Sequence, residues 1–205
     1  MVNKSSQGSD QLYGSAPDQA SKALLIVDAI NDLEFEEGDQ LLQFGLPAAE
    51  KLRDFKHRFR RAGLPVIYAN DNFGKWKSDF SALVDHCLNS EVRGRPIAEL
   101  LPPAEEDYFV LKPKHSAFYG TTLDILLQSL GVKTLYVCGF ATDICVLFTA
   151  NDAYMREYRI RIPADCVAAN SQQQSDGALE LMARVLKADT RPSEQIELHG
   201  STRSD

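Results

Sequence analysis

Four short apolar segments alternate with stretches of helical periodicity, and this alternation limits the possible folds more than any other feature of the chain. The segments are ALLIVD (23–28), LPVIYA (64–69), YFVL (108–111) and LYVC (135–138). Short continuous apolar runs are typical of strands covered on both faces, and such strands pair in parallel when helices connect them. The sequence therefore predicts an α/β protein with three layers, α/β/α, and a mostly parallel sheet.

The remaining elements follow from periodicity and from breaker residues. Helical spacing predicts helices at 46–62, 78–88, 123–130 and 173–186, and alternation predicts a fifth strand at 159–163. Residues 93–103 contain three prolines and are expected to form an irregular connection, while 195–198 are expected to form a tail segment or a short edge strand. We expect a flexible N-terminal arm at 1–21 and a single domain at 22–200.

The composition excludes several classes of partner. The chain has 205 residues, of which 44% are hydrophobic and 25% charged, and its formal net charge is −7. An acidic chain without a basic run is poorly suited to binding nucleic acid or an anionic membrane. No apolar run approaches the ~20 residues that cross a bilayer, and the polar N-terminus lacks the apolar core of a secretory signal. We expect a cytoplasmic protein whose partners are a small-molecule substrate and copies of itself.

The four cysteines, Cys87, Cys138, Cys145 and Cys166, indicate neither a metal site nor disulfides. They form no CxxC pair and have no histidines at ligand spacing, which fits a reducing compartment. We therefore expect neither a zinc site nor a disulfide framework, and we also expect no cofactor.

Cys145 differs from the other cysteines in its predicted position. Residues 134–154, TLYVCGFATDICVLFTANDAY, predict a buried strand, a tight turn from Gly139 and a helix that begins near Asp143 or Ile144. A thiol in the first helical turn lies near unpaired backbone N–H groups, which lowers its pKa and favours the thiolate. A free cysteine is more often a small buried hydrophobe. Its place at the carboxyl edge of an open sheet favours a reacting group instead.

Two charged side chains also end predicted strands. Asp28 closes the first apolar run, and Lys112 follows the third. A buried charge is costly unless it is paired, so opposite charges at equivalent strand ends are expected to meet in space. Alternatively, Asp28 is a solvated loop residue or a helix cap, and Lys112 a solvated loop lysine. Asp32 lies farther into its loop and is the weaker candidate.

The loop after the second strand supplies candidate substrate contacts, namely Asp71, Phe73 and Trp76. Aromatic side chains commonly line small-molecule sites, although a segment with Asn and Gly is equally typical of a surface loop. Phe140, in the turn after the fourth strand, is a further candidate contact. We do not assign His115 to the site, because its neighbours form no metal or triad spacing and a lone histidine is more often a surface residue.

The groups at the strand ends suit acyl transfer. No GxSxG, P-loop or GxGxxG motif stands at a strand-to-helix junction. The chain therefore lacks the motifs that identify serine α/β-hydrolases, P-loop nucleotidases and Rossmann dehydrogenases. A carboxylate, an ammonium and a thiol do follow predicted strands. The carboxylate can take the thiol proton, the lysine can stabilise the negative charges, and turn amides can hold an oxyanion.

Three segments, ALLIVDAINDL, FVLKPKHSAFYGTTL and CGFATDICVLFTANDAY, closely resemble the isochorismatase-like cysteine hydrolase superfamily over about residues 22–186. This superfamily includes nicotinamidase, N-carbamoylsarcosine amidohydrolase, ureidoacrylate amidohydrolase and biuret hydrolase. The resemblance implies a Rossmann-like isochorismatase-type fold and a catalytic triad of Asp28, Lys112 and Cys145. It also implies an oxyanion hole made by the backbone N–H groups of Ala141 and Cys145, with a cis peptide bond between Phe140 and Ala141.

The resemblance implies an activity as well. In enzymes similar to this chain, the thiolate attacks an amide or ureido carbonyl, and water then releases the acid from a thioester. A cysteine amidohydrolase acting on a small amide, carbamoyl or ureido compound is therefore expected. Two alternatives remain: hydrolysis of an isochorismate-type vinyl ether, which needs Asp28 but no thiol, and a catalytically silent binding or scaffold protein.

One departure from the family bears on metal binding. Nicotinamidases carry an Asp-x-His metal motif after the second strand, whereas the matching run here is Asp71, Asn72 and Phe73. No bound metal is therefore expected, and nicotinamidase activity loses support. Because members of the superfamily commonly assemble, a homo-oligomer, either a dimer or a tetramer, is expected.

Overall fold

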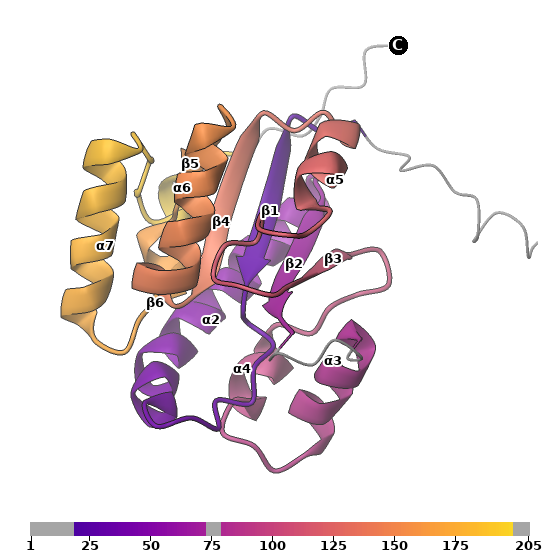
Figure 1. Cartoon of the computed structure of the whole chain (residues 1–205), viewed down its shortest axis with the longest axis vertical. Helices are drawn as coiled ribbons and strands as arrows, with labels where there is room; N and C mark the ends of the chain where they lie inside the picture. The colour runs from indigo at the N-terminus through magenta and orange to yellow at the C-terminus, as the bar shows by residue number, and fades with distance from the viewer. Residues whose placement is uncertain (1–18, 73–78, 199–205) are drawn as a thin grey trace, which may run out of the picture.

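The structure, a computed structural model, describes residues 19–72 and 79–198. Within these residues, six strands form one parallel sheet (Figure 1). The strands are β1 (Lys22–Val27), β2 (Val66–Asp71), β3 (Tyr108–Lys112), β4 (Thr134–Phe140), β5 (Arg159–Arg161) and β6 (Val167–Ala168). Almost all of the expected N-terminal arm, residues 1–21, lies outside the described residues.

The sheet has the strand order β3-β2-β1-β4-β5, and β6 pairs with the end of β4. Val27, the last residue of β1, lies opposite Ala69 of β2 and Gly139 of β4. Asp71 lies opposite Lys112 where β2 and β3 end. The carboxyl ends of these four strands therefore meet at one edge of the sheet, and the predicted α/β fold with a parallel sheet is confirmed.

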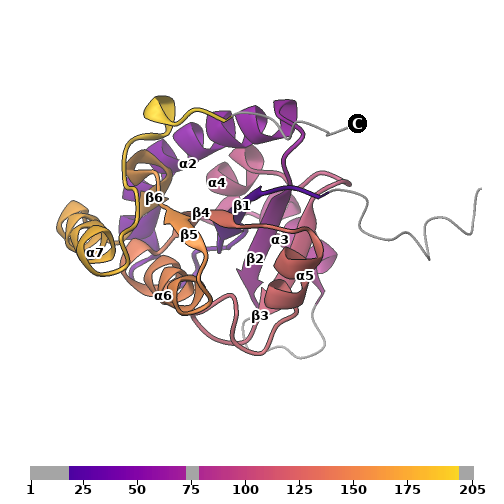
Figure 2. The ribbon, with the colours of Figure 1, turned by 90° about the horizontal axis from the view of Figure 1, so that it is seen from above.

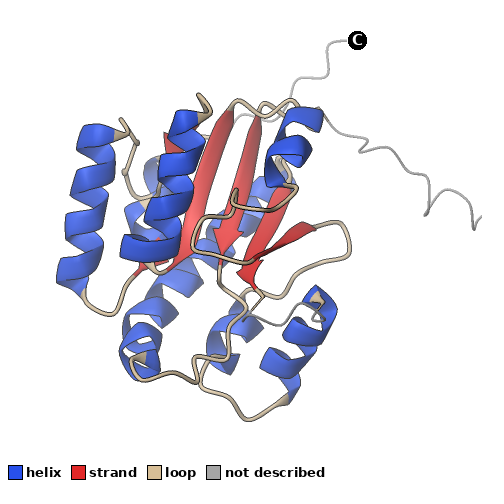
Figure 3. Ribbon diagram, in the orientation of Figure 1, coloured by secondary structure: helices blue, strands red, loops and turns tan. Residues whose placement is uncertain are grey.

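Helices cover both faces of the sheet (Figure 2, Figure 3). They are α2 (Gly38–Arg61), α3 (Phe80–Asn89), α4 (Arg95–Leu100), α5 (Leu123–Ser129), α6 (Leu147–Met155) and α7 (Gln172–Val185), with the π-helical turn η1 (Thr142–Val146) and the 3₁₀ turns η2 (Ala164–Cys166) and η3 (Ser193–Gln195). Residues of α2, α3 and α4 pack on one face, and those of α5, α6 and α7 on the other. None of the helices that the structure describes has the length and apolar character needed to span a membrane.

Alternate side chains of the central strand enter two separate cores. Leu24 and Ile26 of β1 pack with α2, α3 and α4, whereas Ala23, Leu25 and Val27 pack with α5, α6 and α7. All five side chains are fully buried. Burial on both faces explains why this strand has a continuous apolar run instead of an alternating pattern. Each buried Leu or Ile contributes roughly 1.5–3 kcal/mol relative to an exposed one.

The long helix α2 begins at Gly38, earlier than the predicted start at residue 46, and it continues through Pro47. A proline usually marks a helix boundary, because it lacks an N–H group and its ring crowds the preceding turn. Here the turns before Pro47 are held by packing. Leu41 and Gly45 are buried, and a Cβ at Gly45 would lie only 3.2 Å from the side chain of Ile97. Tertiary contact therefore extends the helix into a segment that the sequence pattern assigns to a loop.

Three short elements also differ from the predictions. Residues 93–103 are not wholly irregular, because α4 forms there with Pro96 in its first turn, where the missing N–H costs little. Residues 195–198 do not form a strand, because the 3₁₀ turn η3 ends there and Ile196 is buried in the core. β6 is absent from the prediction, because two residues are too few to show a period.

Candidate active site

The strand order places a topological switch point between β1 and β4. From β1 the chain continues to β2 on one side, and from β4 it continues to β5 on the other. In open parallel sheets, ligands bind at such a point, beyond the carboxyl ends of the strands. Asp28 directly follows β1, and the turn that carries Cys145 follows β4. Two of the three expected catalytic residues therefore stand at this switch point.

The turn after β4 depends on Gly139. This residue has φ of +109°, and a Cβ on it would lie 2.0 Å from the carbonyl oxygen of Val27. Only glycine allows the two backbones to approach so closely. The peptide bond between Phe140 and Ala141, which follows in the same turn, is cis. Beyond it, the π-helical turn η1 is tied to α7 by a buried 3.0 Å hydrogen bond between the hydroxyl groups of Thr142 and Ser175.

Asp28 is held by backbone groups on the neighbouring strand. Its own N–H donates to the carbonyl of Ala69 at 2.9 Å, and its Oδ1 accepts the N–H of Asp71 at 2.8 Å. Its φ of +49° is uncommon for a residue other than glycine. Such conformations occur often at functional sites, where the surrounding structure enforces them. The carboxylate of Asp28 is thus fixed in position before any ligand binds.

Lys112 connects the other groups of the site. Its side chain is fully buried, and its Nζ lies 2.8 Å from Oδ2 of Asp28 and 3.7 Å from Oδ2 of Asp71. The same Nζ donates to Sγ of Cys145 at 3.5 Å and to the carbonyl oxygen of Lys114 at 3.3 Å. A fully buried ammonium is tolerated only with such partners. The structure therefore brings Asp28, Lys112 and Cys145 together, as their positions at strand ends predict.

The pKa values show where the protons lie. Burial, together with the negative charge of Asp28, raises the pKa of the Cys145 thiol to about 12, although Lys112 opposes this. The expectation that the helix end lowers this pKa is wrong, because desolvation outweighs it. Burial also raises the pKa of Asp28 against the opposing charge of Lys112, which makes the carboxylate a stronger base than an ordinary aspartate. Burial alone would lower the pKa of Lys112, but its acidic neighbours, Asp28 first, outweigh it and raise that pKa.

The resting site therefore contains a protonated thiol next to a carboxylate and an ammonium. A hydrogen bond joins the side chains of Asp28 and Cys145, and it raises the pKa of the thiol while it lowers the pKa of the carboxylate. Cys145 is half-buried, whereas Cys87, Cys138 and Cys166 are buried. Cys145 is thus the cysteine that a ligand can reach. The carboxylate of Asp28, in contact with it, can accept the proton of its thiol.

The structure places the residues expected to contact substrate in different environments. Asp71 stands at the site, partly exposed, with its carboxylate near Lys112. The ring of Phe140 is 2% exposed and packs in the core beside Gly45, which does not support a contact with substrate. Phe73 and Trp76 lie outside the described residues.

His115 is the residue of the site that sequence reasoning missed. Its Nδ1 lies 3.8 Å from Sγ of Cys145, and its ring centroid lies 5.6 Å from that of Phe148. The only signal in the sequence is its place three residues after Lys112, in the loop that leaves β3. That signal is weak, because loop conformation decides whether such a residue turns toward the sulfur.

The Isochorismatase domain model matches residues 22–191 of this chain, including all three clustered residues. The chain belongs to the isochorismatase family. The isochorismatase family protein YaaI of Bacillus subtilis is 45% identical over 178 residues, which cover 87% of this chain and 97% of that protein. Ureidoacrylate amidohydrolase RutB of Acinetobacter baylyi is 28% identical over 168 residues, or 70% of this chain and 68% of that protein. The crystal structure of N-carbamoylsarcosine amidase from Thermoplasma acidophilum has a TM-score of 0.68 and 28% identity, covering 87% of this chain and 100% of that one.

This isochorismatase-family hydrolase lacks the donors of the nicotinamidase metal motif. Asn72 follows Asp71 where that motif continues toward a histidine, and its N–H donates to the carbonyl oxygen of Lys112. In residues 19–72 and 79–198, no group of three or more His, Cys, Asp or Glu side chains is placed to hold a metal ion. The described residues therefore do not reproduce the donor set of that motif.

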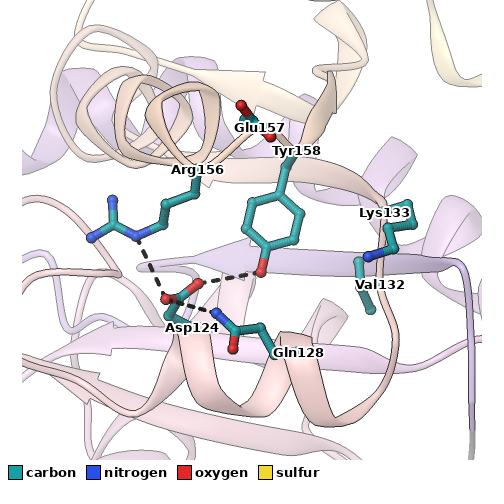
Figure 4. A pocket seen from close by; sticks show the side chains of 7 residues that line it. All are labelled: Asp124, Gln128, Val132, Lys133, Arg156, Glu157 and Tyr158. Atoms are coloured by element: carbon teal, nitrogen blue, oxygen red, sulfur yellow. Dashed lines mark hydrogen bonds and ion pairs between the residues drawn. The ribbon is translucent and has the colours of Figure 1, made fainter.

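A surface hollow of about 540 Å³ lies elsewhere on this isochorismatase-family hydrolase (Figure 4). Its lining includes Lys133, just before β4, so it stands at the amino-terminal edge of the sheet, opposite the clustered triad. Four of its polar side chains contact one another. Asp124 accepts hydrogen bonds from Gln128 at 3.1 Å and from Tyr158 at 3.3 Å, and Arg156 lies 3.9 Å from it. The lining of the hollow contains no cysteine, and the contact of a thiol with a carboxylate and a buried ammonium makes the Cys145 site the better candidate.

Proposed function

We propose that the protein is a cysteine amidohydrolase that cleaves a C–N bond of a small amide, carbamoyl or ureido compound through a thioester on Cys145. The observation that supports this most is the contact of one buried ammonium with both a carboxylate and a thiol. Lys112 Nζ lies 2.8 Å from Asp28 and 3.5 Å from Cys145 Sγ. Acyl transfer through a thioester requires a nucleophile, a base and a stabilising cation in contact with one another.

The reaction begins with proton transfer from sulfur to Asp28. A thiol pKa of about 12 leaves little free thiolate near neutral pH, so the sulfur needs a base as it attacks the carbonyl carbon. Asp28, whose pKa burial raises, is in contact and takes this proton. Lys112 stabilises the negative charge as it passes between the carboxylate and the sulfur. Asp28 then gives the proton to the leaving nitrogen, the C–N bond breaks, and the acyl group stays on Cys145 as a thioester.

The turn after β4 is proposed to hold the oxyanion, through the backbone N–H groups of Ala141 and Cys145. The N–H groups of Ile144 and Val146, on either side of Cys145, both donate to the carbonyl of Ala141, at 3.2 and 3.1 Å. These bonds close the turn around the sulfur. An amide that is already directed at the developing oxyanion typically lowers the barrier by roughly 2.7–4 kcal/mol.

The substrate class rests on the relatives. N-carbamoylsarcosine amidase and ureidoacrylate amidohydrolase are named for carbamoyl and ureido compounds, and both are similar to this chain over most of its length. We propose the same class here. Residues 73–78, which follow β2 in the sequence, lie outside the described residues, so the individual compound is left to experiment. The cytoplasmic location, the homo-oligomeric state and the single domain at 22–200 stay predictions.

The test is a screen of small amides, carbamoyl compounds and ureides for released ammonia or amine, with the Cys145→Ala variant as blank. For any compound that is turned over, Cys145→Ala is expected to lose at least about a thousand-fold in kcat, because the reaction loses its nucleophile. The matched control is Cys87→Ala, which removes a buried thiol of α3 outside the triad and should keep most of the activity.

Two results would contradict the proposal. Full turnover of an amide by Cys145→Ala would exclude the thioester. Hydrolysis of isochorismate by wild type and Cys145→Ala alike, with no amide turned over, would instead support the vinyl ether reaction, which needs Asp28 but no thiol.

A further inference from the structure

A second surface hollow, of about 450 Å³, concentrates positive charge and is called the basic hollow below. Four of the described residues that line it are basic, namely Lys22, Arg159, Arg161 and Arg191, and one, Glu197, is acidic. The whole chain, by contrast, has a formal net charge of −7. A cleft lined by one sign of charge concentrates ligands of the opposite sign. The basic hollow is therefore suited to an anion.

The strand register places the basic side chains in two neighbouring rows. Lys22, Thr134 and Arg159 are partners across β1, β4 and β5, and Tyr136 and Arg161 are partners two residues farther along. Side chains two residues apart on a strand point to the same face of the sheet. Tyr136 packs in the core on the side of α2, so both rows lie on that side. The fold thus gathers cations from two strands that are not neighbours.

The segment after α7 carries the fourth basic residue and is held in place. The guanidinium of Arg191 donates to Asp189 from Nε at 2.9 Å, and its second contact with this carboxylate measures 2.7 Å. Arg161 of β5 pairs with the same carboxylate. Arg58 of α2 donates to the carbonyl oxygen of Ser193 at 2.7 Å, which ties the segment to α2. Figure 2 shows this segment, in yellow, running beside α2. Two arginines are therefore fixed in position before any ligand binds.

The ion pairs inside the basic hollow leave positive charge over. Arg161 and Arg191 share the single carboxylate of Asp189. Arg159 is exposed, and its Nε donates to the hydroxyl of Thr134, a neutral partner, at 3.2 Å. In the part of the chain that the structure describes, its guanidinium forms no ion pair with a carboxylate. Arg159 can therefore donate to an incoming anion without breaking a salt bridge.

We propose that the basic hollow binds a small phosphate monoester through its phosphate group. Guanidinium groups match the geometry of phosphate oxygens and bind them through paired hydrogen bonds. A volume of about 450 Å³ is typical of a small-molecule site and exceeds what one inorganic phosphate fills. Thr134 and Gln195 add a hydroxyl and an amide to the lining, which suit the hydroxyl groups of a sugar.

This site is separate from the triad. Lys22, Thr134 and Arg159 are the first residues of their strands, whereas Asp28 and Cys145 come after the last residues of β1 and β4. Because β1 has six residues, the two edges of the sheet are roughly 20 Å apart. A ligand in the basic hollow therefore does not contact a substrate at Cys145, and it binds whether or not Cys145 is a nucleophile.

The test is isothermal titration calorimetry at constant ionic strength, with ribose 5-phosphate, inorganic phosphate and ribose as probes. Wild type should bind ribose 5-phosphate saturably, inorganic phosphate more weakly and ribose not measurably. Arg159→Gln should weaken the binding of ribose 5-phosphate by about tenfold or more, because it removes a charged hydrogen-bond donor. The matched control is Arg184→Gln, which replaces an exposed arginine of α7 outside the basic hollow and should bind as wild type does.

Four results would overturn the proposal. The first is that wild type shows no saturable binding of ribose 5-phosphate, or that Arg159→Gln binds it equally well. The second is that inorganic phosphate binds as tightly, which would assign the basic hollow to free phosphate. The third is that Cys145→Ala loses the binding while Arg159→Gln keeps it, which would place the anion at the triad. The fourth is that Arg159→Gln has a lower mass than wild type in light scattering, which would assign the basic hollow to contact between copies of the chain.

Discussion

The carboxylate of Asp28 influences the sulfur in two opposing ways. Its charge and its hydrogen bond contribute to the raised pKa of Cys145, and in the proposed mechanism it is also the group that removes the thiol proton. In the proposed mechanism, the thiol stays protonated at rest, and the nucleophile forms only when a carbonyl is present to accept it. An exposed low-pKa thiolate would instead react with any electrophile.

The first prediction concerns Asp28→Asn. Removing the negative charge should lower the pKa of Cys145, because burial and Asp28 raise it and Lys112, which stays charged, lowers it. The rate of alkylation of Cys145 by iodoacetamide at pH 8 should rise by about tenfold for each unit that the pKa falls, while amide turnover is lost. The matched control is Asp85→Asn, which removes an exposed carboxylate of α3. Slower alkylation in Asp28→Asn would show that the thiol needs the carboxylate even for this reaction.

The same reasoning gives the pH dependence of the wild-type protein. With a thiol pKa of about 12, the thiolate fraction rises tenfold per pH unit throughout the range below that value. The alkylation rate of Cys145 should therefore climb from pH 7 to pH 10 without a plateau, measured by peptide mass spectrometry. A plateau below pH 9 would contradict the raised pKa.

At the scale of elements, the site depends on how closely β1 and β4 approach. Val27 and Gly139 are partners in the parallel ladder, and the missing side chain of Gly139 leaves room for the carbonyl of Val27. This contact puts the end of β1, and with it Asp28, beside the turn that carries Cys145. A single glycine thus allows the close packing of two central strands and, with it, the proximity of Asp28 to the turn that carries Cys145.

The second prediction is that Gly139→Ala destabilises the protein strongly. Its Cβ would lie 2.0 Å from a backbone oxygen, at a φ of +109° that side chains avoid, so the strands must move apart. The free energy of unfolding, measured with urea, should fall by at least about 3 kcal/mol. The matched control is Gly177→Ala in α7, where a Cβ meets no atom within 4 Å, and alanine should stabilise the helix by about 0.5–1 kcal/mol. Equal effects of the two substitutions would contradict the close approach.

At the scale of the whole molecule, two apolar cores enclose the sheet, and one of them contains a second buried lysine. Lys56 of α2 is 1% exposed, and its Nζ donates to Tyr68 at 3.1 Å and to the carbonyl of Pro102 at 2.9 Å. These bonds join α2, β2 and the chain after α4. Burial lowers the pKa of Lys56 to about 8, so this group weakens the fold when it is charged.

The third prediction follows from this pKa. Between pH 8 and 10.5 the unfolded chain still holds the proton that native Lys56 has lost, so the free energy of unfolding should rise with pH across that window. Relative to Lys56→Met, wild type should gain about 2 kcal/mol between pH 7.5 and pH 9.5. Urea unfolding at the two pH values measures this. Lys51→Met, at an exposed position of the same helix, should show no such difference. A difference of the opposite sign would mean that Lys56 is stabilised in its charged form.

Much of the fold can be read from the sequence, because local patterns carry it. The apolar runs predict β1 to β4, since strands buried on both faces leave no alternation, and helical spacing predicts α3, α5 and α7 within a few residues. The positions of Asp28 and Lys112 at strand ends also predict that they meet, because parallel strands end at one edge. The start of α2 could not be predicted this way. Gly45 and Pro47 disfavour a helix locally, but packing against Ile97 and Phe140 outweighs that preference.

By itself, the sequence determined the element types, the parallel sheet and the three groups that meet at its carboxyl edge, because these depend on the periodicity of neighbouring residues. Only the tertiary structure decided that the thiol of Cys145 is protonated and that His115 faces it. Desolvation and side-chain contact depend on what packs around an atom, and those neighbours come from distant segments. The loop that carries His115 is directed by hydrogen bonds to α6, more than 30 residues farther along the chain.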